Sequence, residues 1–183
     1  IANLKDARDR AARFVCVIAL ARQGRLLGTF RGSVEGLIVD QPRGEQPEAE
    51  SLDWLEAHSF RTVIDLRKGH DEKAAITSHG MTSVAIPVRA DLLGSTAPTD
   101  AQVSTFFETV LDSTKRPVFF HCRRGADRTG VFAALYRIEI DGWTNQQAIE
   151  EMQAFGFSDR YGTLMRYVRD YRPRGFARPE AAP

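Results

Sequence analysis

Residues 121–130 read HCRRGADRTG, and the predicted fold and chemistry follow from this stretch. The apolar run Val118–Phe120 precedes it, and a helical pattern follows from Val131 to Ile140. A strand that turns directly into a helix leaves several backbone N–H groups pointing into the turn. These donors and the positive end of the helix dipole form a site for an anion. The order of residues therefore predicts a strand, a loop of phosphate size and the start of a helix.

The side chains of this stretch add chemistry to the anion site. Arg128 carries a planar guanidinium that can hold two oxygens of one phosphate group. Cys122 lies in the same positive field, which favours its thiolate and makes it a nucleophile near neutral pH. Gly125 supplies the conformational freedom that the loop needs, and the hydroxyl of Thr129 can donate to the sulfur. Together these residues indicate nucleophilic attack on a phosphate ester.

The stretch resembles the His-Cys-x5-Arg-Ser/Thr signature of the protein tyrosine phosphatase superfamily. The short chain is similar to the dual-specificity branch, especially its small bacterial and plant-type members, from about Pro42 to Tyr171. The resemblance implies a cysteinyl-phosphate intermediate on Cys122. It also implies that His121 supports the loop backbone and helps to set the thiolate environment. The residues implied to bind the substrate phosphate are Arg123, Arg124, Gly125, Ala126, Asp127 and Arg128.

Hydrolysis also needs a proton donor for the leaving oxygen, and a carboxylic acid is the usual donor. Asp91 is the first candidate, because it follows a strand in a loop that resembles the general-acid loop of the dual-specificity enzymes. Asp127 is the rival: it resembles an aspartate of myotubularins and some bacterial lipid-directed phosphatases, where it assists catalysis or holds the loop. Asp100 is a weaker candidate, since a helix start explains it. No metal or cofactor is expected, because backbone dipoles and Arg128 neutralise the phosphate.

Composition fits one globular domain. The chain has 183 residues, of which 43% are hydrophobic and 27% charged, and its formal net charge is +1. Its two cysteines imply no disulfide framework, and Cys16 is expected to be a buried hydrophobe. The apolar run Phe14–Ala21 around it is too short to span a bilayer. The cytoplasm is the default location, with the bacterial periplasm as the alternative if an N-terminal signal was removed.

Periodicity and breaker residues predict alternating helices and strands. Helices are expected over 3–27, 47–58, 72–79, 98–113, 131–140, 144–155 and 161–171. Strands are expected over 62–66, 82–86 and 118–120, with a loop over 88–97. Thr144 and Gln147 form a capping-box pattern. Asp65 and Arg67 follow a strand end and are expected to form a structural ion pair.

Strands separated by helices predict an α/β single domain with a central, mostly parallel sheet and helices on both faces. The resemblance implies the same fold. The expected organisation is an N-terminal helical extension over 1–36, a phosphatase domain over 37–171 and a flexible tail over 172–183.

The resemblance implies phosphotyrosine, phosphoserine or phosphothreonine proteins as substrates. Phosphoinositides or inositol phosphates are the alternative, because Arg123 and Asp127 are similar to residues of lipid-directed members, although Ala126 stands where those carry a second basic residue. A catalytically silent phosphate-binding module, a sulfurtransferase or an arsenate reductase would use a similar loop; the reductase normally needs further cysteines, and only Cys16 is present. A monomer is expected, with no nucleic-acid partner and no stable membrane insertion.

Overall fold

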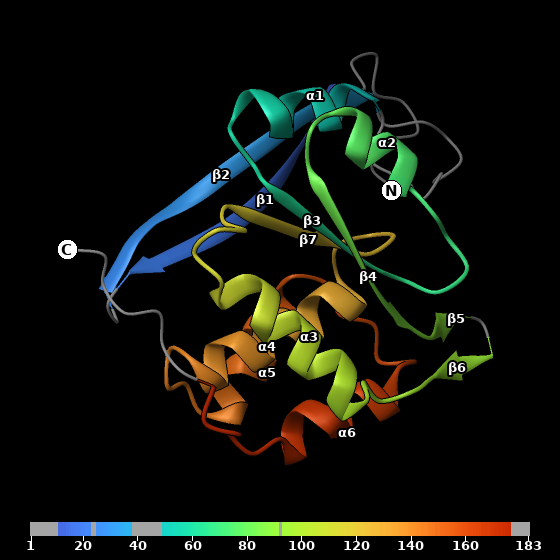
Figure 1. Cartoon of the computed structure of the whole chain (residues 1–183). Coiled ribbons are helices and arrows are strands. Elements are labelled where there is room, and N and C mark those ends of the chain that lie inside the picture. The colour runs from blue at the N-terminus through green and yellow to red at the C-terminus, as the bar shows by residue number, and fades with distance from the viewer. Residues whose placement is uncertain (1–10, 23–24, 38–48, 92, 177–183) are drawn as a thin grey trace. The chain divides into compact units, whose positions relative to one another are not determined.

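A three-stranded parallel sheet, in the order β4-β3-β7, positions the functional loop (Figure 1). Its strands in the computed structural model are β3 (Thr62–Arg67), β4 (Thr82–Val88) and β7 (Val118–His121). Asp65 of β3 lies opposite His121 of β7 in the parallel register. The carboxyl ends of all three strands meet at one edge, which is where ligands bind in open α/β sheets.

The structure describes residues 11–22, 25–37, 49–91 and 93–176, with side chains from Ser51 onward. The chain divides into two compact units, Ile1–Gly44 and Glu45–Pro183. The second unit holds the parallel sheet and its helices, so the boundary between units lies beyond the expected division at residue 36. The limits of 37–171 for a phosphatase domain stay a prediction.

Six helices are described in the second unit, and they cover both faces of the sheet (Figure 1). They are α1 (Ala49–Ala57), α2 (Lys73–Ser78), α3 (Asp100–Leu111), α4 (Asp127–Glu139), α5 (Asn145–Ala154) and α6 (Gly162–Asp170). The expected α/β fold with helices on both faces is confirmed. The helices expected from residue 47 onward are present, with ends that differ by a few residues.

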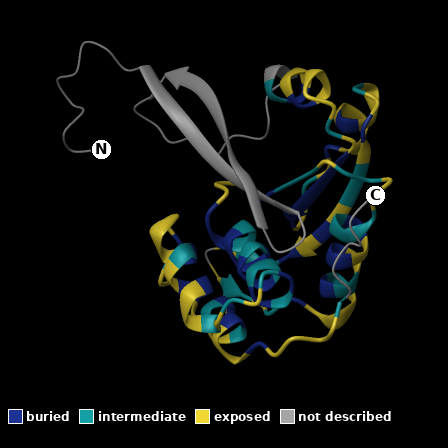
Figure 2. Cartoon of the chain, turned by 90° about the vertical axis from the view of Figure 1, so that its left-hand side faces the viewer, coloured by how far each residue is buried: buried dark blue, intermediate teal, exposed yellow. Residues whose placement is uncertain are grey.

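Alternate residues of β3 supply two separate cores. Val63 packs with Leu52 of α1 and Ile76 of α2 on one face. Ile64 packs on the other face with Phe106 of α3 and Phe132 of α4, all three fully buried. In Figure 2 the buried parts of the helices, coloured dark blue, lie on their inward sides. A strand that is buried on both faces reads as a continuous apolar run, which is why its pattern gave a clear prediction.

Capping boxes fix the starts of two helices. Thr99 accepts a hydrogen bond from the backbone N–H of Gln102 at the start of α3, and the Gln102 side chain accepts one from the Thr99 N–H. Thr144 and Gln147 form the same reciprocal pair before α5. Each pair satisfies two helix N–H groups that would otherwise lack a partner. The capping box expected at Thr144 is confirmed.

The expected N-terminal helix is wrong wherever this segment is described. Residues Ala11–Arg22 form β1 and residues Arg25–Leu37 form β2, which pair as antiparallel strands. The reason lies in the β-branched residues of the run around Cys16, which favour a strand, and in cross-strand pairing that a local helix pattern ignores. Residues 3–10 of the expected helix lie outside the described residues, and so does the side chain of Cys16.

Two other expectations need correction. The loop expected over 88–97 contains a short antiparallel ladder of β5 (Ala90–Asp91) and β6 (Gly94–Ser95). The tail is not loose over 172–176: Glu139 accepts hydrogen bonds from the backbone N–H groups of Arg174 and Phe176, and the Phe176 ring stacks on Phe107 at 4.4 Å. These contacts join residues far apart in the chain, so no local sequence pattern predicts them. Residues 177–183 lie outside the described residues.

The described helices include none that is both long enough and apolar enough to cross a membrane.

Candidate active site

The loop between β7 and α4 has the backbone of an anion site. Gly125 has φ +68°, a conformation that residues with a side chain rarely adopt. Ala126 stands at the N-cap of α4 and supplies no side-chain cap for the first-turn N–H groups. These donors therefore remain directed into the loop, where the positive helix end also acts. The sequence prediction of a strand, a loop and a helix N-terminus is confirmed in geometry.

Cys122 lies inside this loop, and its surroundings lower the pKa of its thiol. It is 5% exposed. Burial alone would raise the pKa of its thiol, but hydrogen bonds from the hydroxyl and backbone N–H of Thr129 and the backbone N–H of Arg124, together with the charge of Arg128, lower that pKa below its usual value. Donors that converge on sulfur stabilise its thiolate, which is the nucleophilic form.

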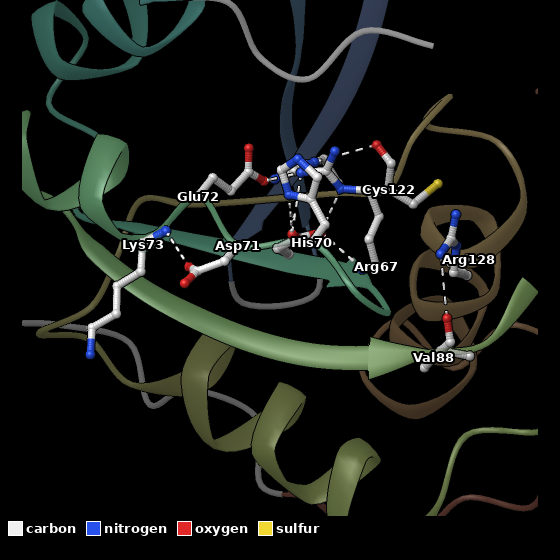
Figure 3. A network of polar contacts seen from close by, with 10 residues as sticks. Arg67, His70, Asp71, Glu72, Lys73, Val88, Cys122 and Arg128 are labelled. Carbon is white, nitrogen blue, oxygen red and sulfur yellow. Dashed lines mark hydrogen bonds and ion pairs between the residues drawn. The ribbon is translucent and has the colours of Figure 1, made fainter.

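Arg128 lies on the first turn of α4 and faces the end of β4 (Figure 3). Its Nη1 donates to the backbone carbonyl of Val88 at 3.4 Å. Its Nε is buried and has no hydrogen-bond partner among the described residues. A buried guanidinium N–H without a partner is costly, so this donor is available for a ligand that enters the loop.

Asp91 lies in β5, shortly after Val88, whose carbonyl contacts Arg128. Its Oδ2 lies 2.9 Å from Nε of Arg89, and its Oδ1 accepts the backbone N–H of Leu93 at 2.8 Å. The hydrogen bond from Arg89 and then that from Leu93 lower the pKa of Asp91. In this arrangement the carboxylate is ionised, so it must gain a proton before it can serve as an acid.

Asp127, the rival acid, has both carboxylate oxygens engaged. Oδ2 pairs with Nη2 of Arg124 at 2.8 Å, and Oδ1 accepts the backbone N–H of Ser158 at 2.9 Å. Its side chain is only 8% exposed. These contacts tie the loop to the turn after α5, which fits the role of holding the loop. Asp100 pairs with Arg174, 2.9 Å away, at the start of α3.

The residues at the rim of the loop are exposed to solvent. Arg123, Arg124 and Gly125 are exposed, whereas Ala126 is buried with Asp127. The buried residues anchor the loop, and the exposed arginines are available to a ligand outside it.

Sequence reasoning missed one residue of the site. Glu72, at the N-cap of α2, lies 2.8 Å from Nε2 of His121 and also contacts Nη2 of Arg67. Arg67 pairs with Asp65 at 2.9 Å, so the ion pair expected there is confirmed. Asp65, Glu72 and His121 lie close enough together to bind a metal ion, but the Arg67 guanidinium contacts both carboxylates and supplies the positive charge. Nothing local in the sequence distinguishes Glu72 from a surface glutamate of a helix start.

Two family models match this chain. The family described as "DSP-PTPase phosphatase fused to NAD+ Kinase" matches residues 36–164. The Ham1 family matches residues 1–49. A dITP/XTP pyrophosphatase of Staphylococcus epidermidis is 30% identical over 80 residues, which are 44% of this chain and 40% of the pyrophosphatase. The similarity to the pyrophosphatase therefore covers less than half of either protein.

Relatives with known names match the larger unit. The dual specificity protein phosphatase TpbA of Pseudomonas aeruginosa is 36% identical over 118 residues, which are 64% of this chain and 51% of TpbA. The chain therefore spans about half the length of this curated relative. A crystal structure of P. aeruginosa TpbA in complex with pTyr is 33% identical, with a TM-score of 0.55, and the match covers 68% of this chain and 75% of that one.

Proposed function

This chain belongs to the family described as DSP-PTPase phosphatase fused to NAD+ kinase, and from that premise we propose that it hydrolyses phosphomonoesters on proteins. The observation that carries the proposal is the surroundings of the Cys122 sulfur. Two backbone N–H groups, the Thr129 hydroxyl and the Arg128 charge all favour its thiolate. A thiolate at the base of a loop of anion-binding donors is placed to attack a bound phosphate.

In the first step, the phosphate oxygens accept hydrogen bonds from the loop N–H groups and from Arg128. The Cys122 sulfur attacks phosphorus, a sulfur–phosphorus bond forms, and the bond between phosphorus and the leaving oxygen breaks. Asp91, once protonated, gives its proton to that oxygen. The free Nε–H of Arg128 supplies a donor for the charge that develops on the phosphoryl oxygens.

In the second step, water attacks the cysteinyl phosphate. Asp91, now ionised, takes a proton from the water, and the sulfur–phosphorus bond breaks. The Thr129 hydroxyl, which helps to lower the pKa of Cys122, stabilises the thiolate that leaves. Phosphate is released, Cys122 is again a thiolate, and the proton taken from water leaves Asp91 protonated for the next turnover.

The proposed substrates are proteins that carry phosphotyrosine, phosphoserine or phosphothreonine. The support is the relative TpbA, a dual specificity protein phosphatase that has been crystallised with pTyr. The exposed Arg123 and Arg124 at the loop rim suit an anionic peptide. The involvement of Asp127 in a structural clamp removes one of the reasons for a lipid-directed assignment.

A substrate panel tests the proposal. Purified protein is assayed with p-nitrophenyl phosphate, with phosphotyrosine, phosphoserine and phosphothreonine peptides, and with phosphoinositides and soluble inositol phosphates. We expect the highest kcat/KM on a phosphopeptide and no turnover by Cys122→Ser. A preference for an inositol phosphate would contradict the substrate assignment. No turnover of any ester by protein that binds vanadate would show a silent binding module.

A further inference from the structure

A buried charge network lies behind the nucleophile loop, and no step of the proposed reaction uses it (Figure 3). It consists of Asp65, Arg67, Glu72 and His121, whose side chains are each 7% exposed or less. Arg67 bonds Asp65 through Nε at 2.9 Å and Nη2 at 3.2 Å, and Nη2 also contacts Glu72. Buried charged groups such as Asp65, Arg67 and Glu72 are costly unless each has a partner, so the arrangement of this network is specific.

His121 joins this network to Cys122. Its Nε2 lies 2.8 Å from Oε1 of Glu72, and its Nδ1 lies 3.3 Å from the backbone carbonyl oxygen of Cys122. The ring also stacks on Phe119, with centroids 5.5 Å apart, which fixes its plane. Burial would raise the pKa of Glu72, but His121 and then Arg67 lower it to about 2, so its carboxylate is ionised and can only accept. Both ring nitrogens of His121 therefore lie against oxygen acceptors, although only Nδ1 has hydrogen-bond geometry among the described residues. A proton on each nitrogen would serve both acceptors.

We propose that Glu72 is a positioning residue of the reaction, which holds His121 as an imidazolium directly behind Cys122. The imidazolium supports the Cys122 carbonyl through Nδ1–H and adds a positive charge beside the sulfur. Arg67, anchored by Asp65, keeps the Glu72 carboxylate in place for this task. The inference rests on the proposed role of Cys122 as the nucleophile. It extends the set of residues that govern the thiolate from the loop to the segment before α2.

Other charged groups face the same region and bear on its pH dependence. Nδ1 of His70 lies 3.4 Å from Oδ2 of Asp65, and the His70 side chain is 24% exposed. Arg128 and Arg124 act on the sulfur from the loop and α4. None of these groups contacts Glu72 in the described residues, so a change at Glu72 reaches Cys122 through His121.

The sign of the effect separates this proposal from simple electrostatics. Glu72→Gln removes a negative charge near Cys122, which by direct Coulomb interaction would favour the thiolate. The proposal requires the opposite, because loss of the carboxylate removes the partner that keeps His121 protonated. A network that served only to stabilise the fold would lower the stability of the variant without moving the ionisation of the thiol.

The test follows the alkylation of Cys122 by iodoacetamide against pH, in wild type and in Glu72→Gln. Peptide mass spectrometry separates Cys122 from Cys16. Only the thiolate reacts, so the midpoint of the rate curve reports the thiol ionisation. The matched control is Glu151→Gln, which makes the same change in another ion pair, with Arg137 at 2.8 Å between α4 and α5. Alkylation needs no turnover, so the readout stays valid if the proposed hydrolysis fails.

We expect the midpoint of Glu72→Gln to rise by about one pH unit, which makes alkylation roughly tenfold slower on the acid side with an unchanged alkaline rate. Glu151→Gln should match wild type. An unchanged or lowered midpoint in folded Glu72→Gln would overturn the proposal. If that variant does not fold, the nitrogen NMR shifts of His121 in wild type decide. Two protonated nitrogens at neutral pH support the proposal, and one unprotonated nitrogen refutes it.

Discussion

Nε of Arg89 lies 2.9 Å from Oδ2 of Asp91, and this ion pair lowers the pKa of the carboxyl group proposed as the general acid. The backbone N–H of Leu93 adds a second hydrogen bond to the same carboxylate. An acid that is ionised before substrate arrives suits the second step, in which it acts as a base. For the first step, the pair must loosen, and a phosphate group that competes for Arg89 would have this effect.

The pair predicts the position of the alkaline limb of the pH–rate profile. A general acid works only while protonated, so activity falls as pH rises through the pKa of Asp91. Arg89 lowers that pKa, so Arg89→Gln should move the falling limb to higher pH. The measurement is kcat/KM against pH with phenyl phosphate, whose leaving group needs a proton. Arg166→Gln, an exposed arginine on α6, is the control. A limb that stays in place in Arg89→Gln would remove Asp91 from the acid role.

Asp91→Asn should slow hydrolysis of phenyl phosphate by roughly 10²–10⁴-fold, the usual range for loss of a general acid. The loss should be much smaller for p-nitrophenyl phosphate, whose leaving group departs without a proton. Asp127→Asn is the comparison, and we expect its main effect to be on stability, because both oxygens of Asp127 hold the loop. Equal losses of Asp91→Asn on the two esters would show that Asp91 has another task.

Arg128→Lys should be nearly inactive, although it keeps the charge. A lysine cannot reproduce the planar pair of donors on the phosphate, nor the Nε–H that is buried and free of partners among the described residues. We expect a fall in both vanadate affinity and kcat, with a melting temperature close to that of wild type. Retention of affinity and rate together would show that Arg128 does not bind the phosphoryl group.

Gly130 allows α4 and α5 to approach closely. A Cβ atom at this position would lie 2.9 Å from Cγ of Met152, which is buried between the helices. Gly130→Ala should therefore reduce the free energy of unfolding by about 1–3 kcal/mol, the usual cost of overpacking. Gly162→Ala, where no atom lies within 4 Å of the added Cβ, should leave stability unchanged or slightly raised. Urea denaturation of both variants gives the comparison, and equal stabilities would contradict the packing argument.

Most helices and strands of the second unit could be predicted from local sequence patterns. The anion loop, the buried strand β3 and the capping box at Thr144 depend on neighbours in sequence, so their residues could be interpreted directly. The β1–β2 pairing depends on contacts between two segments, and the expected helix there was wrong. Helix patterns weigh residues within one segment, whereas a strand is stabilised by its partner.

In the candidate site, too, local contacts could be predicted from the sequence and contacts between distant segments could not. Cys122 lies at the start of the loop, Arg128 and Thr129 lie in the first turn of the helix that follows it, and their proximity follows from the sequence. Glu72 reaches His121 only because β3 and β7 are neighbours in the sheet and the segment after β3 returns over their ends. The clamp between Asp127 and Ser158 also joins distant segments. Such contacts are set by topology, and a single sequence holds no local signal for them.

Trapping the cysteinyl phosphate shows directly whether the reaction passes through Cys122. Wild-type protein is mixed with p-nitrophenyl phosphate, quenched with acid within the first turnovers, digested and mapped by mass spectrometry. We predict a phosphoryl group on the peptide that contains Cys122, formed at the rate of the nitrophenol burst. Cys122→Ser should give neither a modified peptide nor nitrophenol. Steady hydrolysis with no phosphoryl group on Cys122, or with undiminished turnover by Cys122→Ser, would contradict a reaction through this cysteine.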